Sequence, residues 1–492
     1  MDESKPHRSI PRPSWLFIGA VLIGAVLLSW VAIANGFPLV FADSGTYLRI
    51  PLELYYPTDR PPIYGLAIGL PLRLAGLWGI VAVQAIGSAM MIAMTLSIGR
   101  ERPRPVEVIA TCSFLASASS LPWFVGQIMP DLATGFIPLV LFALLTRPAD
   151  APLWQRAGLG ALLTLLIAVH LSHVLLTAGL LGLAAVVMLL AGMGWRETFL
   201  RSLPAALAIL LALLGLSSLN RVAGYEFRPA LSSDTFLLAR LFDGHVAQPT
   251  LARLCREEAL AHCAVQPLVD DPAIAKPGQA YLWDKRSPIG AMLTRDRAGV
   301  IAEQRRIIRT VLHDDPGGVA RLAWRGFAEQ LITVRKGVLP PYSAAMQISR
   351  ILQARLPGDF QAFSHSRQQR GALDPLKFAP DVAVAVAIVL LLPLMLLWAM
   401  RRRQWSLIGL TGLVVATLLL NAAITGDLSG PDDRYQSRVL WLLPLLAACF
   451  VITAARRRIP EPIDIWPPFF PLHWTGERVN EACQLGWLAQ LV

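Results

Sequence analysis

Carboxylate, phenol and guanidinium side chains gather in a short polar stretch near the N-terminus. Asp43 and Tyr47 are four residues apart, so one helical turn would place a carboxylate and a phenol on the same face. That arrangement suits a general base at the boundary between water and membrane. Arg60 precedes Pro61 and Pro62, which stiffen the backbone around it. A guanidinium held in place in this way is suited to binding phosphate.

Each of these residues also has a plainer interpretation. In that interpretation Asp43 caps a helix at the membrane surface, Arg60 extends toward lipid headgroups, and the two prolines only interrupt the chain. The plainer interpretation accounts for each residue taken singly. Their joint spacing favours the chemical one.

Three further polar residues lie between or within apolar stretches. Asp131 follows Pro130 between two apolar runs, where an ionisable group is costly and commonly functional; the alternative is a helix cap. His170 and His173 are three residues apart and therefore share a helix face. We expect the two histidines to line the same cavity, to hydrogen-bond or pack there, and a metal is the weaker alternative.

Two other groups of residues raise the question of a metal. Asp427, Asp432 and Asp433 form an acidic cluster that reads as a solvated loop or, alternatively, as a cation site. Cys255 and Cys263 are eight residues apart, a spacing open to a disulfide or, with His262, to a metal. The sequence predicts no cofactor with certainty and leaves a divalent metal open.

The elements that position these residues are membrane helices. Of the 492 residues 55% are hydrophobic and only 16% charged, which excludes a set of soluble domains. Stretches almost free of charged residues predict about ten transmembrane helices, near 15–34, 78–98, 106–121, 132–146, 157–176, 178–193, 203–220, 381–400, 405–424 and 438–455. Residues 1–34 also resemble a secretory signal, but we favour a retained first helix because its removal would leave an odd number of spans.

The net charge of +11 indicates orientation. With the N-terminus in the cytoplasm, six short cytoplasmic segments hold 16 Lys and Arg against 5 Asp and Glu, and the rest of the chain is neutral. This is the positive-inside pattern, so the charge needs no nucleic-acid partner. The expected location is a bacterial-type inner (plasma) membrane, crossed several times.

This orientation divides the chain into four parts. Residues 1–220 form an N-terminal transmembrane catalytic module with a first external loop at 35–77, and residues 221–380 form an extracytoplasmic insertion. Apolar residues at helical spacing on both sides of 314–318 predict two helices within the insertion, so we expect it to be mostly helical. Residues 381–458 supply the C-terminal transmembrane helices, and the Trp- and Pro-rich tail 459–492 is cytoplasmic or interfacial.

The polar stretch of the first external loop resembles the GT-C superfamily of polyprenyl-phosphate-dependent glycosyltransferases, which includes protein mannosyltransferases and the lipid A aminoarabinose transferase. The likeness lies in an acidic residue with a tyrosine four later, then a basic residue with a double proline and an aromatic, here Asp43, Tyr47, Arg60, Pro61, Pro62 and Tyr64. Asp131 matches a second acidic residue at an external helix end. Two weaker similarities to the family are residues 315–318 and the sequence Asp433-Arg434-Tyr435. The family's usual lysine is replaced by Arg60, and the insertion matches no member known to us.

The resemblance implies a GT-C-like helix arrangement and a mechanism. A polyprenyl-phosphate sugar would arrive from the outer leaflet, with its phosphate held by Arg60 and helped by Arg434 or Arg438. Asp43 would act as general base on an envelope glycan, lipid or protein acceptor, with inversion at the sugar. Asp131 would orient the acceptor or Tyr47. Substrate-binding residues would then include Tyr47, Arg60, Tyr64, His170, His173, Arg434 and Tyr435.

Other functional classes remain as alternatives. A transporter or flippase of lipid-linked glycans predicts polar residues at mid-membrane and a two-fold repeat of interrupted helices, whereas the candidate residues here concentrate at the external face. A membrane-bound acyltransferase or phosphotransferase would use Asp43 or His170. A non-catalytic scaffold for envelope assembly would use the insertion 221–380 as its interaction module.

Overall fold

The described part of the chain is helical throughout. The computed structural model describes residues 15–98, 103–147, 152–335, 339–377 and 381–456, and within them there are helices and no strand. Six segments are long and apolar enough to cross a membrane: Ile63–Leu96, Ser172–Leu190, Trp195–Val222, Asp381–Arg401, Trp405–Leu428 and Asp433–Ala455. The protein is therefore a helical, multi-pass membrane protein, as the sequence predicts.

Four shorter apolar helices complete the predicted set of spans. They are α1 (Trp15–Leu28), α5 (Pro105–Ala118), α7 (Leu132–Leu145) and α8 (Leu153–Ala168). A helix of 14 residues is about 21 Å long, less than the ~30 Å hydrocarbon core of a bilayer. The count of ten spans, and with it the GT-C-like arrangement, stays a prediction.

The longest helix, α4 (Ile63–Leu96), is broken by a glycine. Gly76 has a φ of +62°, in the left-handed region that favours glycine, and Ala75 is also non-helical. The helix therefore has a short first arm, which begins at the double proline and carries Tyr64, and a long second arm, which coincides with the predicted span near 78–98.

The membrane helices pack around α7. Nearly every residue of α7 is buried, so the helix lies inside the bundle and its N-terminus brings Asp131 to the interior. The largest apolar cluster joins α7 to its neighbours α1, α4, α5 and α8, to α9 (Ser172–Leu190) and α10 (Trp195–Val222), and to the C-terminal helices α20 (Asp381–Arg401), α21 (Trp405–Leu428), α22 (Asp433–Leu440) and α23 (Leu442–Ala455).

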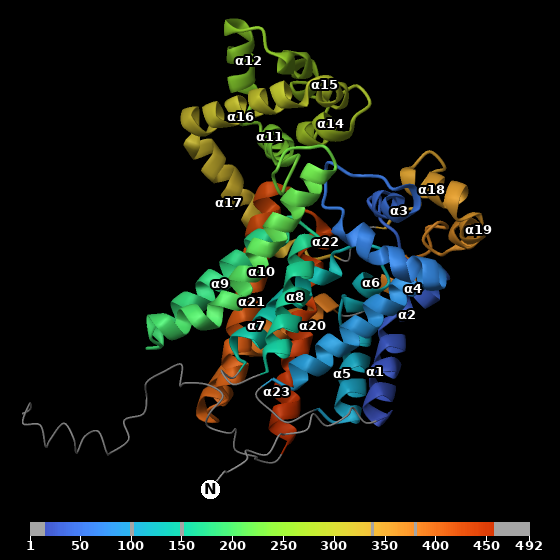
Figure 1. The fold of residues 1–492 in the computed structure, drawn as a ribbon, viewed down its shortest axis with the longest axis vertical. Helices are drawn as coiled ribbons and strands as arrows, with labels where there is room; N and C mark the ends of the chain where they lie inside the picture. The colour runs from blue at the N-terminus through green and yellow to red at the C-terminus, as the bar shows by residue number, and fades with distance from the viewer. Residues whose placement is uncertain (1–14, 99–102, 148–151, 336–338, 378–380, 457–492) are drawn as a thin grey trace, which may run out of the picture.

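The insertion begins at the end of α10 and forms two packing units (Figure 1). The first has an apolar core of its own and consists of α11 (Ser233–Asp243), α12 (Gln248–Glu257), η1 (Ala261–Val265), α13 (Gln266–Val269), α14 (Pro277–Trp283), α15 (Ile289–Arg295), α16 (Arg297–Asp314) and α17 (Pro316–Ile332). The predicted helix pair is confirmed as α16 and α17, separated at Asp315, whose carboxylate caps α17.

The second unit of the insertion covers the first external loop. It comprises α18 (Gln347–Arg355), α19 (Pro357–His365) and η2 (Asp374–Lys377). Its apolar residues share a core with α3 (Ser44–Glu53) and the first arm of α4. The loop that precedes α3 also packs against α2 (Trp30–Asn35) and α6 (Leu121–Val125), and Leu39 forms an isolated parallel bridge with Gln127, just after α6.

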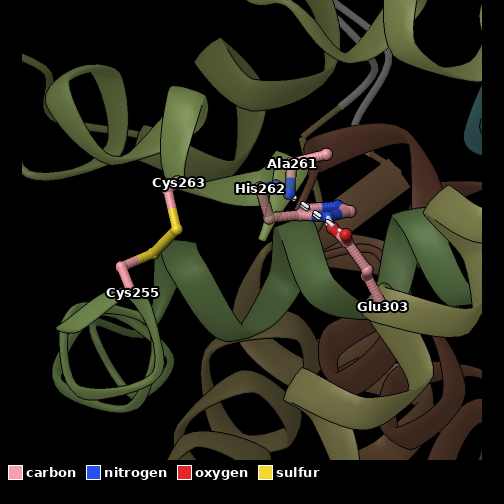
Figure 2. The surroundings of a disulfide bond; sticks show 5 residues. All are labelled: Cys255, Ala261, His262, Cys263 and Glu303. Atoms are coloured by element: carbon pink, nitrogen blue, oxygen red, sulfur yellow. Dashed lines mark hydrogen bonds and ion pairs between the residues drawn. A yellow bond between two sulfur atoms is a disulfide. The ribbon is translucent and has the colours of Figure 1, made fainter. Parts of the chain in front are cut away.

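A disulfide fastens the first unit of the insertion. Cys255 and Cys263 are bonded, which resolves the choice that the sequence left open (Figure 2). Beside the bond the buried His262 contacts Glu303 through Nδ1 at 2.7 Å, and the same carboxylate accepts the backbone N–H groups of Ala261 and His262. Burial lowers the pKa of His262, although Glu303 opposes the shift. This network ties η1 to α16.

Candidate functional site

Asp43 stands at the start of α3, as the sequence predicts, but its side chain does not cap the helix. It occupies the N-cap position with no cap hydrogen bond from its carboxylate. Its backbone oxygen accepts the N–H of Tyr47 at 3.2 Å, so the two residues lie one turn apart. The carboxylate instead contacts Arg60 at 2.9 Å and Arg434 at 3.7 Å. The capping interpretation of Asp43 is therefore wrong.

Arg60 is held among carboxylates and an aromatic ring. It pairs with Asp43 and with Asp59 at 2.7 Å, and its guanidinium lies 5.5 Å from the centre of the Tyr47 ring. Its side chain is only 14% exposed, so it does not extend into lipid headgroups. Burial disfavours the charged form, but Asp43 and Asp59 outweigh that effect and raise the pKa of Arg60. Arg60 is therefore a fixed cation.

Two tyrosines pack next to the Asp43–Arg60 ion pair. The rings of Tyr47 and Tyr64 meet edge to face at 5.0 Å, and the Tyr64 hydroxyl donates to Gln84 Oε1 at 2.8 Å. Gln84 in turn donates to the backbone oxygens of Val125 and Gln127. Burial raises the pKa of Tyr47, and the charges of Arg60, Asp43, Asp131 and Arg434 all act on it. Tyr47 thus stays a neutral phenol at the centre of the charged groups.

Helix α22 brings a second arginine to Asp43 from the other end of the chain. Arg434 lies over the Phe41 ring at 4.2 Å and over the Tyr435 ring at 5.0 Å, and its side chain is 13% exposed. Its Nε and Nη1 atoms are buried and donate no hydrogen bond to any described residue. Unsatisfied guanidinium donors in a buried position favour an anionic partner.

Asp131 and Arg438 form a fully buried ion pair deeper in the bundle. Arg438 Nη1 donates to Asp131 Oδ1 at 3.0 Å, and Arg438 Nη2 donates to Asn421 Oδ1 at 3.0 Å. The Arg438 side chain is 0% and the Asp131 side chain 3% exposed. Asp131 makes no cap hydrogen bond with its side chain, so the capping interpretation is wrong here as well.

Tyr435 lies between the two arginines of α22. The Arg434 guanidinium is 5.0 Å and the Arg438 guanidinium 5.2 Å from its ring centre. A continuous series of contacts therefore leads from Asp131 through Arg438, Tyr435 and Arg434 to Asp43. The structure brings together all of the predicted acidic, basic and aromatic residues of the site.

The two histidines adjoin this group, and their rings are 5.2 Å apart. Both nitrogens of His173 are engaged, Nε2 with Thr134 Oγ1 at 2.8 Å and Nδ1 with the backbone oxygen of Leu166 at 2.6 Å. His170 contacts Ser172 Oγ through Nδ1 at 2.8 Å. The hydrogen-bonding interpretation therefore fits His173. His170 lies close enough to Arg434, Arg438 and Arg60 for all three charges to act on its ring.

In the acidic cluster near the last span, Asp427 and Asp432 each make a structural hydrogen bond. The carboxylate of Asp432 accepts the N–H of Arg434 and so caps α22, while the backbone oxygen of Asp427 accepts from Arg240. Across the part of the chain that the structure describes, no group of three or more His, Cys, Asp or Glu side chains is placed to hold a metal.

Sequence reasoning missed two amides that organise the site. Asn421 holds Arg438 and also donates to the backbone oxygen of Tyr435 at 2.7 Å, and Gln84 holds Tyr64. Both lie within predicted apolar spans, near 405–424 and 78–98. A polar side chain inside a membrane helix is costly unless paired, and that signal was present in the sequence.

The second unit of the insertion closes over the loop that carries Asp43. Thr46 Oγ1 donates to Gln347 Oε1 at 2.9 Å, and Gln368 exchanges hydrogen bonds with the backbone of Val40 at 3.1 and 2.8 Å. At Gly45 a Cβ would lie 2.8 Å from the backbone nitrogen of Ile348, so only glycine allows this approach.

Comparison of the chain with protein-family models, with curated proteins and with solved structures finds no match.

Proposed function

We propose that this protein is a membrane glycosyltransferase of the GT-C type. It transfers a sugar from a polyprenyl-phosphate donor to an envelope glycan, lipid or protein acceptor on the extracytoplasmic face of a bacterial-type inner membrane. The N-terminus and the short basic loops lie in the cytoplasm.

The observation that carries the proposal is the meeting of one carboxylate with two arginines from opposite ends of the chain. Asp43 lies 2.9 Å from Arg60 and 3.7 Å from Arg434, and two nitrogens of Arg434 have no hydrogen-bond acceptor among the described residues. A carboxylate beside two fixed cations is the arrangement needed to take a proton near a leaving phosphate.

In the proposed reaction the donor phosphate binds to Arg60 and Arg434 and so competes with Asp43 for them. The released carboxylate accepts the proton of the acceptor hydroxyl or amine. The acceptor atom forms a bond to the anomeric carbon while the bond from that carbon to the phosphate oxygen breaks, with inversion. The leaving phosphate keeps the electron pair, and the two guanidinium groups stabilise its charge.

Replacing Asp43 with Asn tests this role. Purified protein in lipid nanodiscs is supplied with polyprenyl-phosphate sugars and envelope acceptors, and product is measured by mass spectrometry. Loss of a general base lowers the rate by about 10²- to 10⁴-fold. Because donor binding depends on the arginines, D43N retains it.

Glu53→Gln is the matched control. Glu53 lies on the same helix and is also ion-paired, with Arg49 at 2.8 Å and Arg355 at 3.3 Å, but it does not contact Arg60 or Arg434. E53Q is expected to keep normal activity. Full activity of D43N would refute the catalytic assignment of Asp43.

A further inference from the structure

A second site lies outside the group around Asp43, where the insertion meets the end of a membrane helix. A cavity of about 420 Å³ opens between the C-terminal end of α11 and α17. Its lining is polar and includes Arg240, Arg321, Arg325 and Glu329. Nothing in the proposed glycosyl transfer uses these residues.

Arg240 is a mostly buried residue whose guanidinium keeps free donors. The residue is 9% exposed, and its Nε donates to the backbone oxygen of Asp427 at 3.3 Å. That is the one hydrogen bond of its guanidinium to a residue that the structure describes, so the two terminal nitrogens keep their donors free. Nη2 lies against Gly326, 2.7 Å from the position that a Cβ there would occupy, so a side chain at 326 would displace it. Because Arg240 lines the cavity, a ligand there can accept from these donors.

Arg321 and Arg325 add two cations from one face of α17. They are four residues apart on the helix and therefore adjacent. Arg325 is exposed and forms no ion pair with a described residue, while Arg321 Nη2 lies 3.9 Å from Asp315 Oδ1. Both side chains are free to turn toward an anion in the cavity.

The three carboxylates of the cavity lining differ in whether they already accept a hydrogen bond. Asp243 Oδ1 accepts the N–H of Gly278 at 2.7 Å, and Asp315 Oδ1 accepts the N–H of Gly318 at 2.7 Å. Both are thereby engaged by backbone donors. The charges of Asp243, Asp427 and Glu329 all act on Arg240, and Glu329 is exposed. It is the one lining carboxylate, within the described chain, with no hydrogen bond or ion pair.

We propose that this cavity binds a phosphate or phosphodiester group together with the polar group that carries it. Guanidinium groups bind phosphate oxygens in pairs, and three of them converge on one space. A volume of about 420 Å³ exceeds what a phosphate alone requires and accommodates an attached glycerol or sugar. The inference is independent of the proposed glycosyl transfer.

Glycerol 1-phosphate is the probe for this site. The full-length protein in phosphatidylcholine nanodiscs is titrated calorimetrically with the probe and, in a parallel experiment, with glycerol. The wild type is expected to bind the phosphate and not glycerol. Arg325→Ala weakens binding by about tenfold, the effect of one charge-assisted hydrogen bond. Glu329→Gln tightens binding, because the opposing charge is removed.

Arg309→Ala is the control variant. Arg309 is exposed on α16, makes no ion pair with a described residue and does not line the cavity, so its replacement leaves binding unchanged. Arg325 and Glu329 are exposed, so neither change threatens folding, and thermal unfolding checks this. Equal binding by wild type, R325A and E329Q would overturn the proposal, as would equal weakening by R309A.

A second arm identifies the source of the phosphate. The titration is repeated in nanodiscs that contain phosphatidylglycerol. If phosphatidylglycerol lowers binding of the probe to the wild type but not to R325A, the lipid competes for the cavity. The ligand is then a lipid headgroup phosphate. If binding is the same in both lipids, the ligand is a soluble phosphorylated compound. Both results support the site, and the absence of probe binding in phosphatidylcholine overturns it.

Discussion

Arg438 and Asp131 are charged residues from which water is excluded. Taking an ion from water into a low-dielectric interior costs several kcal/mol, and the partner charge repays this only with good geometry. Here each ion is held in place: Arg438 by Asp131 and Asn421, and Asp131 by Arg438, at 3.0 Å in each case. The pair therefore fixes how α22 sits against α7 and α21, and so where Arg434 points.

Replacing Arg438 with Met should destabilise the protein strongly. The change keeps much of the side-chain volume but leaves the Asp131 carboxylate buried without its cation, at a cost of about 3–5 kcal/mol. Thermal unfolding in detergent, followed by circular dichroism, measures the effect.

The double variant Asp131→Leu/Arg438→Met is the control, because it removes both charges. It should recover most of the lost stability, since an apolar pair of similar volume is often as stable as a buried ion pair. A double variant as unstable as R438M would show that packing around Arg438, and not its charge, sets the stability.

Residue spacing predicted the local part of the site and missed the distant part. The i,i+4 relation of Asp43 and Tyr47 was correct because a helix fixes that geometry. The expected role of Asp131 in orienting an acceptor or Tyr47 stays a prediction, but its ion pair with Arg438, across 307 residues of sequence, was not predicted. No local pattern reports such a contact, because it depends on how the helices pack.

Helix α17 belongs to the insertion in sequence but packs against the membrane helix α21. The two approach so closely at Gly326 and Gly426 that a Cβ on either glycine would collide with the backbone of the other helix. At its end, Gln330 exchanges hydrogen bonds with the backbone of Asp432 at 2.9 and 3.0 Å. The apolar pattern that follows 314–318 predicted the helix, but not the partner against which its small residues pack.

Gly326→Ala should therefore separate α17 from α21. Overpacking at such a contact costs about 1–3 kcal/mol, and we expect a lower unfolding temperature and faster proteolysis of the insertion. Gly290→Ala is the matched control, because Gly290 is also helical and has open space around it. It should be neutral or stabilising. Equal stability of the two variants would contradict the close contact.

At the scale of the whole molecule, the apolar pattern predicted the helical membrane class, and the charge pattern predicted an orientation. Four of the six basic segments lie between apolar helices and two lie before the first and after the last, while Asp43 and the insertion lie on the opposite side of the proposed topology. The sequence did not reveal that the insertion forms two packing units. The residue pattern of α18 and α19 is that of any amphipathic helix, and it does not identify α3 as their partner. The tail 459–492 lies outside the described residues.

Cysteine labelling tests this orientation. In a Cys483→Ser background, Arg309→Cys on the insertion and Arg403→Cys at the turn between α20 and α21 each provide one exposed thiol. A membrane-impermeant maleimide added to spheroplasts should label the first and not the second. After lysis both should react. The reverse pattern would invert the topology and place Asp43 in the cytoplasm.

The pairing of Asp131 with Arg438 also implies a delay during biosynthesis, because the two residues are made at different times. At about 5–20 residues per second, the ribosome needs roughly 15–60 s to reach Arg438 after Asp131, given the 307 residues between them. Until then the carboxylate has no permanent partner, and α7 cannot settle at the centre of the bundle with its charge satisfied. A chain that stops before α22 would therefore leave Asp131 without its cation.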